Sequence, residues 1–207
     1  MWYCLTFLIG FMLSGVCFGS NLLFQRLCIR KKMYWLQGMG MVIVSLIPTV
    51  VICAFFSIHP FHFLSLLNWK LWIIAIATVM LTSLIIFLKH DSYNDEAIFI
   101  LCVESACMEI PQRIMMQSLV CGILAMQSKQ RIVGILITAL IWCASIIIQA
   151  CITKNNNWKY IFIELAASFV FSIGIGYVYY VAQCLFIPML AHAAERVFTR
   201  KILSKRQ

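Results

Sequence analysis

The chain has 207 residues, of which 63% are hydrophobic and only 11% are charged, and its mean hydropathy is +0.96. An average soluble domain is roughly 45–50% apolar and about 25% charged, so a water-soluble globule could not bury this much apolar surface. The composition excludes a soluble enzyme, a nucleic-acid-binding domain and a secreted disulfide scaffold. It predicts an all-α, multi-pass transmembrane helix bundle.

The formal net charge of +9 comes largely from basic clusters beside apolar segments. Four Lys or Arg residues lie within 26–32, directly after the first apolar run, and four more lie within 200–207. Such clusters are typical of cytoplasmic anchors that contact anionic lipid. We therefore expect membrane lipid, and no nucleic acid, as a partner.

A membrane-spanning helix needs about 20 apolar residues, and the sequence contains about seven segments of this kind. In chain order they are 2–25, 38–58, 69–88, 97–126, 132–152, 160–183 and 185–199. No polar loop separates the last two segments, which predicts a re-entrant or broken helix near Pro188.

The distribution of basic residues predicts the orientation of the bundle. If the N-terminus lies outside, the inner loops and tail carry 11 Lys and Arg, and the outer loops carry 3. The positive-inside rule then favours an outer N-terminus and an inner C-terminus. The compact format, without an organelle signal, favours a bacterial cytoplasmic membrane.

The fourth segment, 97–126, is unusual in length and in content. As one helix it would be about 45 Å long, more than a bilayer core requires. Pro111, near its middle, lacks a backbone donor and should bend the helix. Carbonyl groups freed there must face an internal polar cavity rather than lipid.

Several charged side chains and one histidine fall inside the apolar segments. They are Glu104, Glu109, Arg113, Glu164, His192, Glu195 and Arg196. Charges at membrane depth are costly and face the interior of a bundle. Glu109 and Arg113 are four residues apart and can pair on one helical face. We expect them to form one buried polar cluster with the charged residues of the last segment.

This cluster has two interpretations. Its four glutamates and two arginines leave a charge of −2 when His192 is neutral, which a divalent cation would cancel. His192 and Glu195 share a helical face and are candidate metal ligands. Alternatively, Glu164 and Glu195 lie near the membrane interface and the remaining charges form a structural ion-pair network.

Three stretches together resemble a known family. Met108–Arg113 resembles the Glu-Glu-x-x-x-Arg motif of the CAAX prenyl endoprotease and bacteriocin-processing (CPBP, or Abi) family of intramembrane metalloproteases. Leu140–Ile146 stands where that family shows Phe-x-x-x-His. Phe171–Arg196 resembles its last motif, in which a glycine-bearing helix and a Tyr-rich turn precede a Pro and then His-x-x-x-Asn/Asp.

The resemblance covers about 97–199, which we expect to be the functional core of a single membrane domain over 1–207. The helices of 1–96 precede this core, and a basic cytoplasmic tail, 200–207, follows it.

The family's chemistry implies intramembrane hydrolysis of a membrane-associated peptide or a prenylated protein by a metal-bound water. It implies Glu109, Arg113 and His192, which match the motifs, as catalytic candidates, and Glu104, about one helical turn before Met108 on the same face, could replace the missing first Glu. One zinc ion would be held by His192 together with Glu195, Glu104 or Glu109.

The chain departs from the family's pattern at three positions. Met108 replaces the first Glu, Ile146 replaces the second-motif His, and Arg196 replaces the final Asn or Asp. A thioether cannot act as a general base, and an isoleucine ligates nothing.

Two hypotheses follow. The first is a metallopeptidase with a degenerate, rearranged site. The second is a catalytically inactive member without zinc, acting in bacteriocin self-immunity or as a peptide-binding membrane protein. A small transporter or channel is a third, for which an inverted repeat is expected, and none is visible in the sequence.

Overall fold

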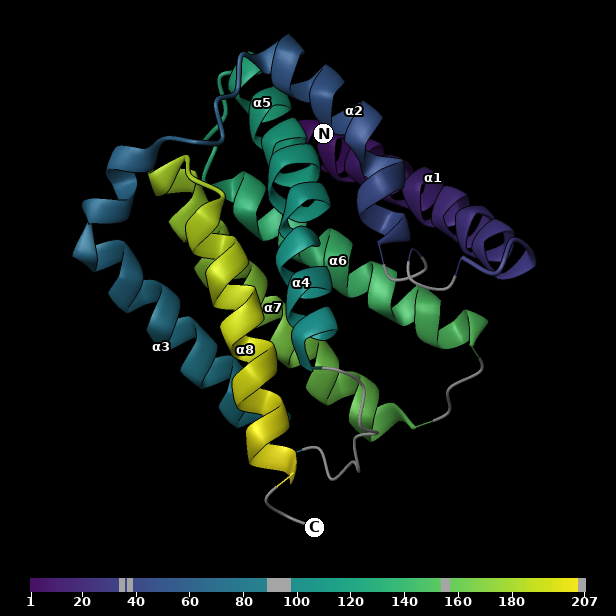
Figure 1. Cartoon of the computed structure of the whole chain (residues 1–207). Helices are drawn as coiled ribbons and strands as arrows, with labels where there is room; N and C mark the ends of the chain where they lie inside the picture. Colours follow the sequence, from purple (N-terminus) through teal and green to yellow (C-terminus); the bar gives the residue numbers. More distant parts are fainter. Residues whose placement is uncertain (34–35, 37–38, 89–97, 154–156, 205–207) are drawn as a thin grey trace.

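The computed structural model describes residues 1–33, 36, 39–88, 98–153 and 157–204, and these ranges form an all-α bundle (Figure 1). Its α-helices are α1 (Trp2–Arg30), α2 (Gly40–Phe56), α3 (Trp69–Ile86), α4 (Ile98–Cys107), α5 (Ser118–Met126), α6 (Val133–Ile152), α7 (Trp158–Ala182) and α8 (Phe186–Ser204). A short 3₁₀-helix (Phe63–Leu67) precedes α3, and a π-helix (Ile110–Gln117) joins α4 to α5. The predicted all-α class is confirmed.

Several helices have the length and composition needed to cross a membrane. They are α1, α3, α6 and α7, and α2 is a shorter apolar helix. A helix satisfies its own backbone hydrogen bonds, which lipid cannot do. These helices agree with the predicted multi-pass membrane protein. The predicted segment start at 38, the loop 89–96, the segment start at 97 and the tail residues 205–207 lie outside the described residues.

The fourth predicted segment is interrupted near Pro111, as its sequence indicated, but by a change of helix type. The π-helix begins directly after Glu109, with Pro111 as its second residue. Its ladder uses i→i+5 hydrogen bonds, and such turns occur frequently at functional sites. Along the rest of the π-helix, every side chain from Arg113 to Gln117 is buried, so this stretch lies inside the bundle.

The prediction of a broken last segment was wrong. α7 ends where Gln183 adopts a left-handed conformation (φ 47°), and α8 runs without interruption from Phe186 to Ser204. Pro188 is only the third residue of α8. A proline is tolerated in a first helical turn because backbone N–H groups there have no intrahelical acceptor.

The connection between α2 and α3 packs against the α7–α8 junction. The Leu185 backbone N–H donates to the Pro60 carbonyl at 2.9 Å, and the Ser65 hydroxyl donates to the Ala182 carbonyl at 2.6 Å. These bonds join segments more than a hundred residues apart in the sequence. They fix where α8 starts and therefore how far along the bundle its polar residues lie.

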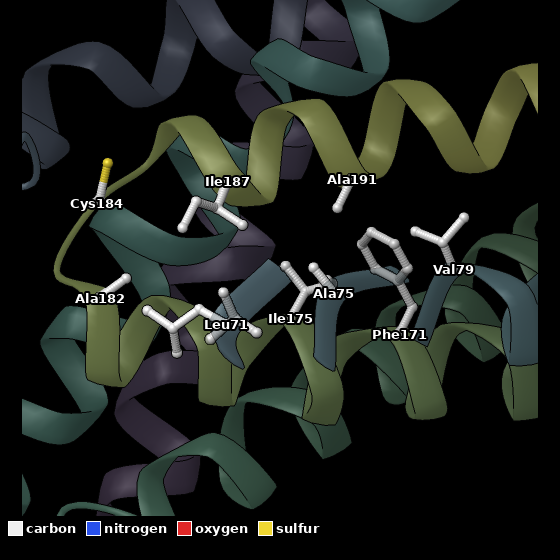
Figure 2. Close-up of a cluster of buried hydrophobic side chains, with 10 residues drawn as sticks. Leu71, Ala75, Val79, Phe171, Ile175, Ala182, Cys184, Ile187 and Ala191 are labelled. Carbon is white, nitrogen blue, oxygen red and sulfur yellow. The ribbon is translucent and has the colours of Figure 1, made fainter. Parts of the chain in front are cut away.

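α3, α7 and α8 pack against one another through a cluster of buried apolar side chains (Figure 2). Leu71, Ala75 and Val79 of α3 meet Phe171, Ile175, Val178 and Ala182 of α7, and Cys184, Ile187 and Ala191 complete the cluster. Gly174 lets α3 approach closely, because a Cβ there would collide with the Thr78 side chain. The ring of Phe171 also contacts the His192 ring, with centroids 4.8 Å apart. The cluster thus sets the position of His192.

Candidate functional site

A buried glutamate lies between a histidine and an arginine in the centre of the site. Glu109 Oε1 is 2.6 Å from His192 Nδ1, and Glu109 Oε2 accepts a hydrogen bond of 2.8 Å from Arg113 Nε. Glu109 and Arg113 are fully buried, and His192 is 8% exposed. The predicted i, i+4 pair between Glu109 and Arg113 is therefore formed, and α8 supplies the third member.

The Arg113 guanidinium is anchored on the side away from Glu109. Its Nη1 donates to Gln117 Oε1 at 3.3 Å and to the Ser172 carbonyl of α7 at 3.2 Å. Gln117 Nε2 in turn donates to the Gly176 carbonyl at 2.7 Å. A Cβ at Gly176 would lie about 3 Å from both side chains, so the absence of a side chain there leaves room for this arrangement.

The sequence analysis missed Gln117, although its signal was present. Gln117 is a polar residue in an apolar segment, four positions after Arg113, on the face already assigned to Glu109 and Arg113. Ser172 and Gly176 could not be found in this way, because they contribute backbone carbonyls.

The second pair of charges lies further along α8. Glu195 is 3% exposed, its Oε1 accepts a hydrogen bond from the Thr199 hydroxyl at 3.0 Å, and its Oε2 is 3.4 Å from Arg196 Nε. The Arg196 side chain is 39% exposed. The carboxylate of Glu195 therefore already has a donor and a cationic neighbour.

A partly open cavity of about 480 Å³ lies beside these residues, among α1, α2, α3, α6, α7, α8 and the start of the π-helix. Four positions matched to the family's motifs reach it: Met108, Ile146, His192 and Arg196. Glu164 and Glu195 also line it, whereas Glu104 is not one of its lining residues. The structure thus gathers the motif positions around one space, but two of them present apolar side chains.

Two of the glutamates near the cavity have a cationic partner. Glu109 is compensated by Arg113, and Glu195 lies beside the half-exposed Arg196. The net −2 expected from the sequence also includes Glu104 and Glu164, which have interactions of their own. Among the described residues, the charged side chains that line the cavity are Glu164, Glu195 and Arg196, which sum to −1 when His192 is neutral.

The donor set does not fit the zinc ion that the family's chemistry implies. Within the described ranges, no three His, Cys, Asp or Glu side chains are grouped so that they could hold a metal ion. Both oxygens of Glu109 are bonded to other side chains, and a catalytic zinc normally has three protein ligands. Among the described residues, the His and acidic side chains that line the cavity and that such an ion would have to use are Glu164, His192 and Glu195.

These features define a class: a multi-pass helical membrane protein with a charge-compensated Glu–Arg–His cluster beside a partly open cavity. Residues 96–198, about half of the chain, match the family described as type II CAAX prenyl endopeptidase Rce1-like. No curated protein and no solved structure shows significant similarity to the chain. The chain belongs to the CAAX protease family, as its motifs suggested.

Proposed function

We propose that this chain binds a membrane-associated peptide or the modified end of a prenylated protein in the cavity beside His192, without zinc-dependent hydrolysis of that ligand. The observation that carries the proposal is the engagement of Glu109, whose two oxygens bond His192 and Arg113. A general base must lie within hydrogen-bond reach of the attacking water, whereas Glu109 is fully buried and is not among the residues that line the cavity.

The composition of the cavity wall supports binding of a peptide. Ser168, Gln112 and Gln149 supply polar groups, and Phe18, Trp142 and Ile146 supply apolar surface. A volume of about 480 Å³ lies within the roughly 300–1,000 Å³ of typical ligand pockets. Such a wall suits an apolar chain that carries peptide groups, as a bacteriocin recognised in self-immunity would.

The second candidate is the metallopeptidase with a rearranged site. It is favoured by one observation: His192, Glu164 and Glu195 all line the same cavity. A movement of Glu195 away from Thr199 and Arg196 would be needed before these residues could share an ion. The catalytic roles predicted for Glu104, Glu109, Arg113 and His192 belong to this candidate.

Binding is tested with one cavity variant and a matched control on α7. Ser168 lines the cavity, whereas Ala166, two residues earlier, is exposed and does not line it. Ser168→Phe should fill the cavity and abolish crosslinking of a photoreactive prenylated peptide to the purified protein, and Ala166→Phe should leave crosslinking unchanged. Equal crosslinking in both variants would place the peptide elsewhere and refute the proposal.

The choice between the two candidates is made by metal content and peptide cleavage. We expect less than about one tenth of a zinc ion per purified chain and no cleavage of the peptide in added zinc. As a positive control, the variant Met108→Glu/Ile146→His/Arg196→Asn restores the family's residues and should gain zinc. About one zinc ion per wild-type chain, lost together with cleavage in His192→Ala, would establish the metallopeptidase instead.

A further inference from the structure

A second cavity, of about 550 Å³, lies at another level of the bundle. It is formed where α2, α5 and α7 end, and on α7 it contacts Tyr179, Tyr180 and the adjoining Gln183. The cavity beside His192 contacts α7 only between Glu164 and Ser172. The two cavities share no lining residue, so this second one is a separate site.

The walls of the second cavity are mainly aromatic and aliphatic, and they continue to the outer surface. Phe55, Phe56, Tyr180 and Met126 are among the lining residues. Phe55 and Met126 are 69% and 65% exposed. Exposed apolar side chains thus continue the cavity wall to the surface, where an apolar molecule can reach it.

Among the described residues, one cation and no acid line the second cavity. That cation is Arg131. Within the described residues, its guanidinium has no hydrogen bond or ion pair. A guanidinium presents a planar fork that matches a carboxylate with two parallel hydrogen bonds. The cavity is therefore complementary to an anion.

The charge balance indicates which anion. A carboxylate carries one negative charge, which one guanidinium neutralises. A phosphate monoester carries about −1.5 to −2 at pH 7, so a single guanidinium leaves part of its charge uncompensated. A carboxylate is therefore the better match for Arg131.

The inner wall adds polar groups that a ligand can reach. The hydroxyls of Ser118 and Tyr179 lie 3.4 Å apart and both belong to lining residues. At the rim, α2 and α7 end at Ser57 and Gln183, which adopt left-handed conformations with φ of 52° and 47°. Left-handed residues commonly terminate helices, so these two residues mark the helix ends that frame the rim.

We propose that the second cavity binds a single-chain amphiphile that carries one carboxylate, with its head at Arg131 and its apolar tail between Phe55, Phe56 and Tyr180. This proposal does not rest on the function proposed for the cavity beside His192, because the two cavities have no lining residue in common among the described residues, although Gln117 lines the second cavity and also bonds Arg113.

The proposal is tested by photolabelling the full chain in neutral nanodiscs with a diazirine-bearing long-chain fatty acid. Adducts are mapped by mass spectrometry, and dodecanoate, dodecyl phosphate and dodecanol serve as competitors. We expect adducts on α5 and on the end of α7, displaced by dodecanoate at concentrations about tenfold lower than by dodecanol, as a lost charge-assisted contact predicts. Dodecyl phosphate should compete more weakly than dodecanoate.

Arg131→Gln and Lys129→Gln form a matched pair of variants. Both remove one positive charge from an exposed residue of the same loop, but Lys129 does not line the cavity. Labelling at α5 and α7 should fall about tenfold in Arg131→Gln and stay unchanged in Lys129→Gln. Equal labelling of the two variants would overturn the proposal. So would competition by dodecanol as strong as that by dodecanoate, or competition by dodecyl phosphate stronger than that by dodecanoate.

Discussion

Replacing Arg113 by methionine should destabilise the bundle through the charge it leaves behind. Arg113 is fully buried and donates to Glu109, Gln117 and the Ser172 carbonyl. Methionine fills a similar volume but donates nothing, so Glu109 would keep only its contact with His192. Removing one partner of a buried ion pair costs about 3–5 kcal/mol. In a membrane protein we expect a loss of unfolding free energy at the lower end of this range, about 3 kcal/mol, because polar groups also find partners in the unfolded state.

A double-mutant cycle separates this charge effect from lost packing. Glu109→Gln alone leaves Arg113 uncompensated, whereas Glu109→Gln with Arg113→Met removes both charges. The double variant should therefore cost less than the sum of the single variants, by about 2 kcal/mol, as contacting groups commonly couple. The assay is reversible unfolding in mixed micelles with increasing sodium dodecyl sulfate, followed by tryptophan fluorescence.

One result would refute this reasoning. If the two single-variant costs add to the double-variant cost within about 0.5 kcal/mol, as distant independent sites do, the pair at 2.8 Å does not contribute as an ion pair. Lys129→Gln, an exposed charge outside the cluster, serves as the control and should change stability by less than about 0.5 kcal/mol.

Three further predictions use the same unfolding assay. Gly174→Ala should cost about 1–3 kcal/mol by overpacking α3 against α7, because the new Cβ would meet Thr78. Gly15→Ala has open space at its Cβ and should be neutral or stabilising; equal costs at the two glycines would contradict the close approach. Gln117→Leu should cost about 1–3 kcal/mol by leaving buried polar groups without a partner, while Gln112→Leu, whose side chain lines the cavity, should cost clearly less. Asn68→Ala should cost about 0.5–2 kcal/mol, because the Asn68 side chain accepts a hydrogen bond from the Lys70 N–H at the start of α3. Asn68→Asp keeps an acceptor and should retain most of the stability, and a loss equal to that of Asn68→Ala would argue against the cap.

Local patterns in the sequence determined much of the architecture. Apolar runs of membrane length predicted the long helices, because lipid requires each spanning segment to satisfy its own backbone. The pair between Glu109 and Arg113 was predictable for a related reason: residues four apart lie on one helical face whatever surrounds the helix. The family's motifs were also readable, since they are short stretches within single segments.

The tertiary structure alone decided how those segments meet. His192 reaches Glu109 across 83 positions of sequence, and this contact depends on the register in which α8 packs against its neighbours. That register follows from the packing of Phe171 and Ala191 and from the bonds that hold the α7–α8 junction. The sequence placed ionisable groups at membrane depth. Because pairing between helices depends on packing, only the fold determined that Glu109 is shared by His192 and Arg113.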